Sequence, residues 1–341
     1  MGEPAGRPDA PGAGHVLGVD SGGSGLRIAV ARADDPEARP LALRTSDEPV
    51  RTGPAGIDAE HLLSQLLPAA AELAREAGAD GFTAGCVGAA GMATLGEELR
   101  TRLPGALATA FGVRRLALAA DAVTAYAGAL GQRPGAVVAA GTGMIALGTD
   151  LTPEGGWRRA DGWGHLLGDC GGGAWIGRAG LEAALRAYDG RPGGSAALLA
   201  RAEAVFGPVT GLPGALYPRP DRPAVLASFA PEVARCATGD DAVALGILRA
   251  AAGHVADAAA AVCPPGSGTT VACTGGLFAM GEPLLTPLRA ALAERLPEAR
   301  ATLPAGSPLD GSLTIAAALS RDRLTLPVDR KLLQITRPAP G

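Results

Sequence analysis

The sequence contains two copies of one pattern, in which an apolar strand runs into a glycine turn and a second strand leaves it. The first copy covers residues 15–31, with its turn at residues 21–25. The second covers residues 135–148, with its turn at residues 141–143. Alternating apolar residues on both sides of a glycine turn are typical of a β-hairpin. Strands and helices follow each copy, which predicts an α/β fold of two similar domains that face one another.

Apolar spacing and capping residues predict the helices. Leucines recur at helical intervals over residues 58–77, with Asp58 placed as the N-cap and Gly78 as the C-cap. Residues 97–111 fit a helix that Pro104 interrupts. Further helices are expected over residues 122–130, 175–188, 195–206, 222–237, 240–262 and 312–319.

Charge and composition exclude several classes of protein. The 30 basic and 34 acidic side chains give a net charge of −4 with no basic patch, which disfavours nucleic acid or an anionic membrane as the main partner. No apolar run reaches the roughly 20 residues of a membrane span, and residues 1–14 lack the basic end and apolar centre of a signal peptide. The five cysteines form no CxxC pair, so neither a zinc site nor a disulfide framework is expected. We therefore expect a soluble, cytoplasmic protein.

The first glycine turn is a candidate phosphate site. A turn without bulky side chains lets backbone N–H groups approach phosphate oxygens, and the hydroxyls of Ser21 and Ser24 add donors. Asp20, at the end of the preceding strand, can hold Mg²⁺ through water. The alternative is a hairpin that uses its glycines only for positive φ. A P-loop is excluded, because Lys331 is the one lysine and no Gly-Lys-Ser/Thr motif exists.

Two later glycine segments extend this hypothesis. Gly141-Thr142-Gly143 forms the second turn, and Gly275-Gly276 follows an apolar strand over residues 269–273. Alone, Gly141-Thr142-Gly143 favours a plain β-turn, and the small residues Gly275-Gly276 equally allow helix–strand packing. Taken in this order along the chain, the three glycine segments would surround one nucleotide in a cleft between two domains.

Two aspartates are candidates for chemistry on a second substrate. Asp121 ends an apolar strand just before a helix, where it serves either as an N-cap or as a base that accepts a hydroxyl proton. Asp169 lies within residues 162–177, a stretch with seven glycines and two tryptophans. So many glycines suit a backbone that wraps closely around a polar ligand.

These motifs resemble the sugar-kinase/actin/Hsp70 superfamily, and within it the BadF/BadG/BcrA/BcrD ATPase group that contains N-acetylglucosamine kinase. The most specific segment, residues 162–177, is similar to the GWGxxxGDEGS-x-WIG signature of amino-sugar kinases, and the resemblance spans residues 16–320. It implies two actin-like (ribonuclease H-like) domains, each a mixed five-stranded sheet with helices, around a central cleft. We expect a flexible N-terminus over residues 1–14, an N-terminal domain over 15–122 and a C-terminal domain over 123–341, whose last helix can pack back on the N-terminal domain.

The resemblance also implies roles for individual residues. Asp121 would be the catalytic base for the sugar 6-hydroxyl, and Asp20 would organise Mg²⁺. The residues implied to bind ATP are Ser21, Gly22, Gly23, Ser24, Gly141, Thr142, Gly143, Gly275 and Gly276. Those implied to bind the sugar are Ser46, Asp47, Asp121, Thr142, Trp163, His165 and Asp169. Related kinases are often dimers, which allows a homodimer.

The sequence departs from the family pattern in two places. The Asp-Glu-Gly of the signature reads Asp169-Cys170-Gly171, and the Thr-Asn of the sugar loop reads Thr45-Ser46-Asp47. Asp47 is either a solvated loop residue or the partner of a protonated 2-amino group, which a carboxylate stabilises. Because the sequence also looks like actinobacterial glucosamine kinases, we predict phosphorylation of glucosamine by ATP. The alternatives are an N-acetylglucosamine kinase, an ATPase activator and a sugar-sensing regulator.

Overall fold

The structure is a computed structural model that describes residues 14–22, 25–53, 56–266 and 268–336. It divides into two units. The first unit takes the described parts of residues 1–133, 151–156 and 305–341, and the second takes residues 134–150 and 157–304. This division differs from the boundary predicted after residue 122, because the helix that follows stays with the first unit, where it packs against the C-terminal helix.

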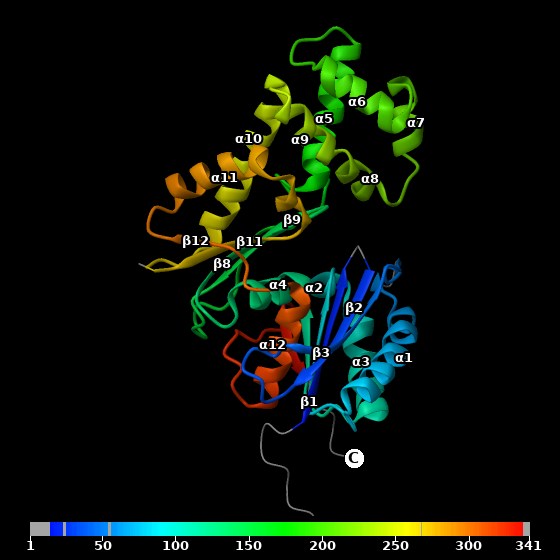
Figure 1. The fold of residues 1–341 in the computed structure, drawn as a ribbon, viewed down its shortest axis with the longest axis vertical. Helices are drawn as coiled ribbons and strands as arrows, with labels where there is room; N and C mark the ends of the chain where they lie inside the picture. Colours follow the sequence, from blue (N-terminus) through cyan, green and yellow to red (C-terminus); the bar gives the residue numbers. More distant parts are fainter. Residues whose placement is uncertain (1–13, 23–24, 54–55, 267, 337–341) are drawn as a thin grey trace, which may run out of the picture. The chain divides into compact units, whose positions relative to one another are not determined.

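The first unit is built on a six-stranded mixed sheet with the order β13-β7-β6-β1-β2-β3 (Figure 1). The neighbours β1, β6 and β7 run parallel, and the other pairs are antiparallel. Five strands were predicted, and the sixth is β13 from the end of the chain, which pairs with β7. The strands are β1 (His15–Gly22), β2 (Gly25–Arg32), β3 (Pro40–Ser46), β6 (Ala84–Ala89), β7 (Leu116–Ala120) and β13 (Leu333–Thr336).

Helices cover both faces of this sheet (Figure 1). On one face α1 (Ala59–Ala77) and α3 (Glu97–Phe111) bury their leucines against the strands. As predicted, Asp58 caps α1 by accepting the His61 N–H, and Gly78 ends it in the left-handed conformation. The predicted interruption at Pro104 is wrong: α3 continues through it, because the buried face of Leu99, Leu103 and Leu107 holds the helix together.

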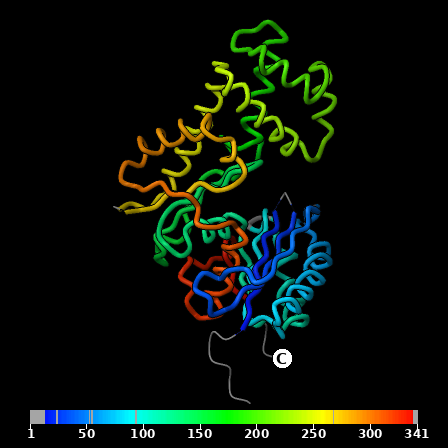
Figure 2. Tube along the Cα trace, in the orientation of Figure 1, coloured from blue at the N-terminus to red at the C-terminus, as the bar shows by residue number. Residues whose placement is uncertain are grey.

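On the other face α4 (Asp121–Leu130) and α12 (Pro308–Ser320) pack closely, and glycines permit the approach. A Cβ at Gly311 would lie 1.9 Å from the Thr124 carbonyl oxygen of α4. A Cβ at Gly18 of β1 would lie 2.6 Å from Ser312 Oγ of α12. The chain trace therefore brings the C-terminal helix beside the N-terminal strand (Figure 2).

The second unit is built on a five-stranded sheet with the order β10-β9-β8-β11-β12. Its strands β8, β11 and β12 are parallel neighbours, while β8, β9 and β10 pair antiparallel as a meander. A core of alanine, valine and leucine joins this sheet to the helices α5 and α10. The strands are β8 (Gly135–Ala140), β9 (Met144–Thr149), β10 (Arg158–Asp161), β11 (Thr270–Thr274) and β12 (Arg300–Thr302).

In the second unit the helices predicted over residues 175–188, 195–206 and 240–262 are present, whereas those over residues 212–216 and 282–295 were not predicted. The single helix predicted over residues 222–237 is two helices, α8 (Arg222–Ser228) and α9 (Ala230–Thr238), which meet at the buried Phe229. Pro231 explains the break, because proline lacks an N–H and fits the first turn of a new helix. The other helices are α5 (Gly173–Tyr188), α6 (Ala196–Phe206), η1 (Val209–Gly211), α7 (Leu212–Leu216), α10 (Ala242–Val262), η2 (Gly276–Met280) and α11 (Glu282–Arg295).

Helix α10 is the one described helix that is long and apolar enough to cross a membrane by length and composition. It packs against β8, β9 and α11 as a core helix of the second unit. The first unit also holds the short elements β4 (Thr52–Gly53), β5 (Gly56–Ile57) and α2 (Met92–Leu95).

Candidate active site

In the first unit, the carboxyl ends of three parallel strands place two aspartates near each other. Asp20 of β1 is level with Gly88 of β6, and Ala89 of β6 is level with Ala120, the last residue of β7. Asp121 comes next in the chain and is the first residue of α4. Ligands of open α/β sheets bind at such carboxyl ends.

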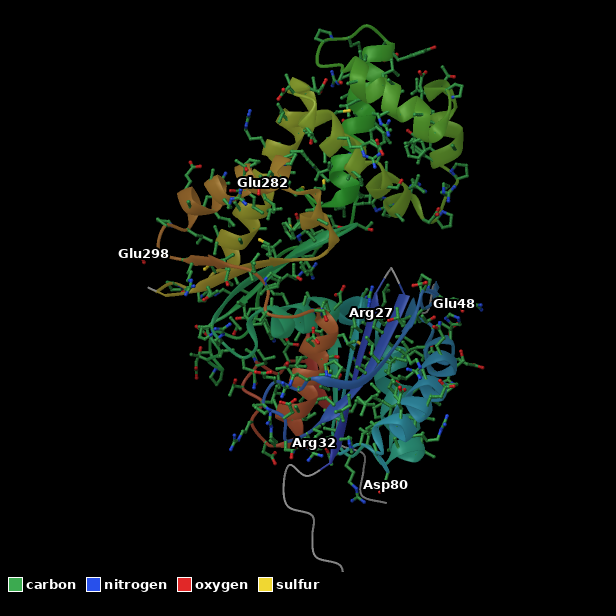
Figure 3. The ribbon with its side chains drawn as sticks, in the orientation of Figure 1. Arg27, Arg32, Glu48, Asp80, Glu282 and Glu298 are labelled. Carbon is green, nitrogen blue, oxygen red and sulfur yellow. The ribbon has the colours of Figure 1, made fainter. Side chains whose placement is uncertain are left out.

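The carboxylate of Asp20 is buried and paired with a cation. Only 5% of Asp20 is exposed, and its Oδ2 accepts a hydrogen bond from Arg27 Nη1 at 3.1 Å. Arg27 reaches it from the opposite position on β2, where Figure 3 labels it. Burial raises the pKa of Asp20 above its ordinary value, and the charge and hydrogen bond of Arg27 oppose that rise.

Asp121 is half-buried at the N-terminus of α4. It is not the N-cap, since Ala120 holds that position; instead its Oδ1 accepts the N–H of Ala122 at 2.9 Å. Burial raises the pKa of Asp121, the Ala122 hydrogen bond lowers it, and the negative charge of Asp20 raises it further. A carboxylate in such surroundings binds a proton more readily than one in water.

The hairpin between β1 and β2 lies against the end of β3. A Cβ at Gly25 would lie 2.1 Å from the Ser46 carbonyl oxygen and 3.1 Å from Asp47 Cα, so only glycine fits there. Ser46 Oγ accepts the Glu48 N–H at 3.3 Å, while Asp47 is exposed. Ser21 is buried and Gly22 half-buried in β1. The predicted ATP-binding residues Gly23 and Ser24 lie outside the described residues.

In the second unit, the turn at residues 141–143 is joined to the start of α5. The Gly141 N–H donates to the Gly143 carbonyl at 2.9 Å. The carbonyls of Gly141 and Thr142 accept the N–H groups of Gly173 and Ala174, both at 2.8 Å. Within the described residues, no hydrogen bond takes up the N–H groups of Thr142 and Gly143. These two donors are therefore available to an anion.

The predicted nucleotide glycines of β11 lie beside this turn. Gly275 has φ +108°, and a Cβ there would lie 2.2 Å from the Ala140 carbonyl oxygen at the end of β8. Gly276 begins η2 and faces open space. The structure thus brings Gly275 to the residue that precedes the Gly141 turn.

Asp169 also contacts the turn at residues 141–143. It has φ +54°, and its Oδ1 accepts the Gly164 N–H at 3.0 Å. A Cβ at Gly143 would lie 2.4 Å from Asp169 Oδ2. Burial raises the pKa of Asp169, and the hydrogen bond from Gly164 opposes this rise. The second oxygen of this carboxylate therefore faces the glycine turn.

The loop at residues 162–168 carries the other predicted sugar-binding residues. The Trp163 ring is 66% exposed, and the Arg159 guanidinium lies 4.4 Å from its centroid. His165 lies close enough for its charge to lower the pKa of Asp169. Its Nε2 is buried and has no hydrogen-bond partner among the described residues. An unpaired buried nitrogen is costly unless a ligand or water completes it.

Comparison with protein families shows which family the chain belongs to. The profile of the BadF/BadG/BcrA/BcrD ATPase family matches residues 17–313. The chain belongs to this ATPase family. Over a stretch of 71 residues, the chain is 44% identical to an N-acetylmuramic acid/N-acetylglucosamine kinase of Clostridium acetobutylicum. That match spans 21% of this chain and only 22% of the relative's length.

Solved structures resemble the ATPase family member over most of its length. A putative N-acetylglucosamine kinase from Chromobacterium violaceum is 28% identical, with a TM-score of 0.63 over 89% of this chain and 99% of that one. A putative N-acetylglucosamine kinase from Porphyromonas gingivalis is 17% identical, with a TM-score of 0.63 over 90% of this chain and 99% of that one. A glucokinase from Streptomyces griseus, in complex with glucose and AMPPNP, is 18% identical, with a TM-score of 0.52 over 90% and 99%. The last two show the fold alone, and together these likenesses confirm the predicted two-domain, actin-like fold class.

The sequence analysis missed two residues that form hydrogen bonds to the candidate aspartates, Arg27 to Asp20 and Asp161 to Asp169. Arg27 could have been found, because the register of the predicted hairpin sets it opposite Asp20. Asp161 gives no such signal: it accepts the N–H groups of Asp169 and Cys170, eight and nine residues further along the chain.

The side chains that could ligate a metal ion do not cluster in the described part of the chain. No group of three His, Cys, Asp or Glu there could hold a metal ion. Magnesium is commonly held by one or two carboxylates together with substrate phosphates. Asp20 fits that mode, since it is an oxygen ligand at a strand end, although one of its oxygens already binds Arg27.

Proposed function

We propose that this protein is an ATP-dependent sugar kinase that phosphorylates N-acetylglucosamine on its 6-hydroxyl. Membership of the ATPase family supports the use of ATP. Two relatives, one of them similar over 89% of the chain, are named as kinases of N-acetylglucosamine. These names favour N-acetylglucosamine over the predicted glucosamine.

The observation that carries the proposal is the environment of Asp121. General-base catalysis needs a carboxylate whose affinity for a proton is higher than in water. Burial and the nearby charge of Asp20 raise the pKa of Asp121 in that direction. As the sugar oxygen forms its bond to the γ-phosphorus, the bond from that phosphorus to the ADP oxygen breaks, and the hydroxyl proton passes to Asp121.

The second unit also carries groups suited to a phosphate and to a sugar. The N–H groups of Thr142 and Gly143 suit the phosphate oxygens, because they have no other acceptor among the described residues. Asp169 Oδ2 suits a sugar hydroxyl, with Trp163 and His165 nearby on the same loop. Asp20 would hold Mg²⁺, which when bound neutralises charge on the phosphates.

A coupled assay of ATP consumption tests the proposal. The purified protein is offered glucosamine, N-acetylglucosamine, glucose and mannose, and we expect N-acetylglucosamine to give the highest kcat/KM. D121N should lose about 10²–10⁴-fold in kcat, the usual contribution of a general base, with KM for the sugar changed little. D80N, at an exposed residue, is the matched control. Sugar-independent ATP consumption, or near-normal turnover by D121N, would contradict the proposal.

Glucosamine remains a second candidate because of Asp47. Asp47 is exposed and its Cα lies beside Gly25 at the start of β2, where a protonated amine could pair with its carboxylate. If glucosamine is the substrate, D47N should lower kcat/KM for glucosamine and leave that for N-acetylglucosamine unchanged. An equal effect on both sugars would remove this candidate. A homodimer and a cytoplasmic location stay predictions.

A further inference from the structure

The loop that carries Asp169 is closed at its base by a second carboxylate. Asp161, the last residue of β10, accepts the N–H of Asp169 at 2.6 Å and the N–H of Cys170 at 2.9 Å. Both hydrogen bonds run to an ionisable acceptor, which makes them stronger than bonds between neutral groups. They hold the two ends of the loop at residues 162–168 together.

The backbone around Asp161 is shaped for this contact. Asp161 itself has φ +59°, a conformation that few residues other than glycine, Asn and Asp adopt. A Cβ at Gly168 would lie 2.4 Å from Asp161 Oδ1, so the carboxylate occupies the space a side chain would need. Arg159 donates to the carbonyls of Asp161 and Gly162 at 3.0 and 2.6 Å. Arg159 thus binds the backbone carbonyls, and the Asp161 carboxylate is left to accept the backbone N–H groups of the loop.

The carboxylates of Asp161 and Asp169 accept hydrogen bonds from different backbone N–H groups. Asp161 accepts those of residues 169 and 170, and Asp169 Oδ1 accepts that of Gly164. With its backbone and Oδ1 both engaged, Asp169 keeps Oδ2 beside Gly143. Among the described residues, Asp161 alone accepts the backbone N–H of Asp169.

We propose that Asp161 is the positioning residue for the sugar site: it holds the Asp169 backbone so that Oδ2 of Asp169 stays beside Gly143. This inference rests on the proposed sugar-kinase function. Asp161 does not touch the sugar; it acts through Asp169. Burial is the main cause of the raised pKa of Asp169, and the negative charge of Asp161 adds to it, while His165 and Arg159 lower it.

The test compares D161N with D35N. Asp35 also accepts two backbone N–H groups, from Glu37 and Arg39, but in the first unit and far along the chain from the loop. Hydrogen exchange is measured over peptides that cover residues 162–172, and KM is measured for sugar and for ATP. We expect D161N to exchange at least tenfold faster in this loop and to raise KM for the sugar at least tenfold, with KM for ATP unchanged. D35N should change neither quantity.

The pH profile gives a third measurement. D161N removes a negative charge that raises the pKa of Asp169, and any exposure of Asp169 would lower this pKa as well, so the acid limb of kcat/KM for the sugar should move to lower pH. Two results would overturn this inference and leave the proposed function standing, provided that the wild-type protein is active. One is wild-type hydrogen exchange of the loop in D161N. The other is faster exchange in D161N with an unchanged KM for the sugar and an unchanged acid limb. A wild-type protein that phosphorylates none of the four sugars would overturn the proposed function first, and the inference with it.

Discussion

The contact between Gly143 and Asp169 gives a quantitative prediction for G143A. The new Cβ would lie 2.4 Å from Asp169 Oδ2, whereas ordinary contacts begin at 3.4 Å, so one group must move by about 1 Å. Gly143 does not have a positive φ, so backbone strain adds nothing to this cost. A displacement of 1 Å in an active site can lower the rate about 10²-fold. We therefore expect kcat/KM for the sugar to fall about 100-fold.

The assay is the coupled ATP-consumption reaction with the best sugar of the screen. G246A is the control, because Gly246 lies in α10 and an added Cβ there would meet nothing within 4 Å, so its activity should not change. G141A tests the same turn without the overlap, since its Cβ also meets nothing within 4 Å, and its loss should be smaller than that of G143A. A kcat/KM for G143A within about threefold of wild type would refute the placement of Asp169 Oδ2 as a functional group.

Three further predictions concern stability and reactivity. The pKa of Asp121 is raised in the folded state, so its ionised form opposes folding above pH 3.8. D121N should therefore unfold at a higher temperature than wild type at pH 7 and show no such gain near pH 3. A lower unfolding temperature of D121N at pH 7 would contradict this. G311A should lose about 1–3 kcal/mol in urea unfolding because its Cβ would overlap the Thr124 carbonyl, whereas G105A in α3, with open space, should lose nothing. Burial raises the pKa of Cys86, which is fully buried, so this thiol should not react with a thiol reagent at pH 8 until denaturant is added; rapid labelling of Cys86 in the native protein would show the burial to be wrong.

Much of the fold could be predicted because its signals are local. The cap at Asp58 and the left-handed Gly78 depend on residues within a few positions, and both were found. The second hairpin was found from the strand pattern around Gly141. Pro104 misled the prediction because helix propensity is weaker than the packing of a buried leucine face.

What could not be predicted depends on contacts between distant parts of the chain. Strand β13 is only four residues long, and its place in the sheet is set by β7, more than two hundred positions earlier. The same limit applies to the site. The aspartates were identified from their motifs, but the raised pKa of Asp121 depends on burial and on Asp20, which only the fold brings close. The role of Asp161 depends on the path of the loop, which composition does not reveal.

The return of the chain to the first unit has a consequence for biosynthesis. The chain leaves that unit after Arg133 and rejoins it at Ala305. During translation, β7 therefore emerges with one edge unpaired, and the α12 side chains that pack against Gly18 are absent until residues 308–336 leave the ribosome. The residues of the second unit are almost contiguous in the chain, so this unit can finish folding before the first unit is complete. A premature stop codon near residue 304 would spare the five-stranded sheet and disable the unit that holds Asp121.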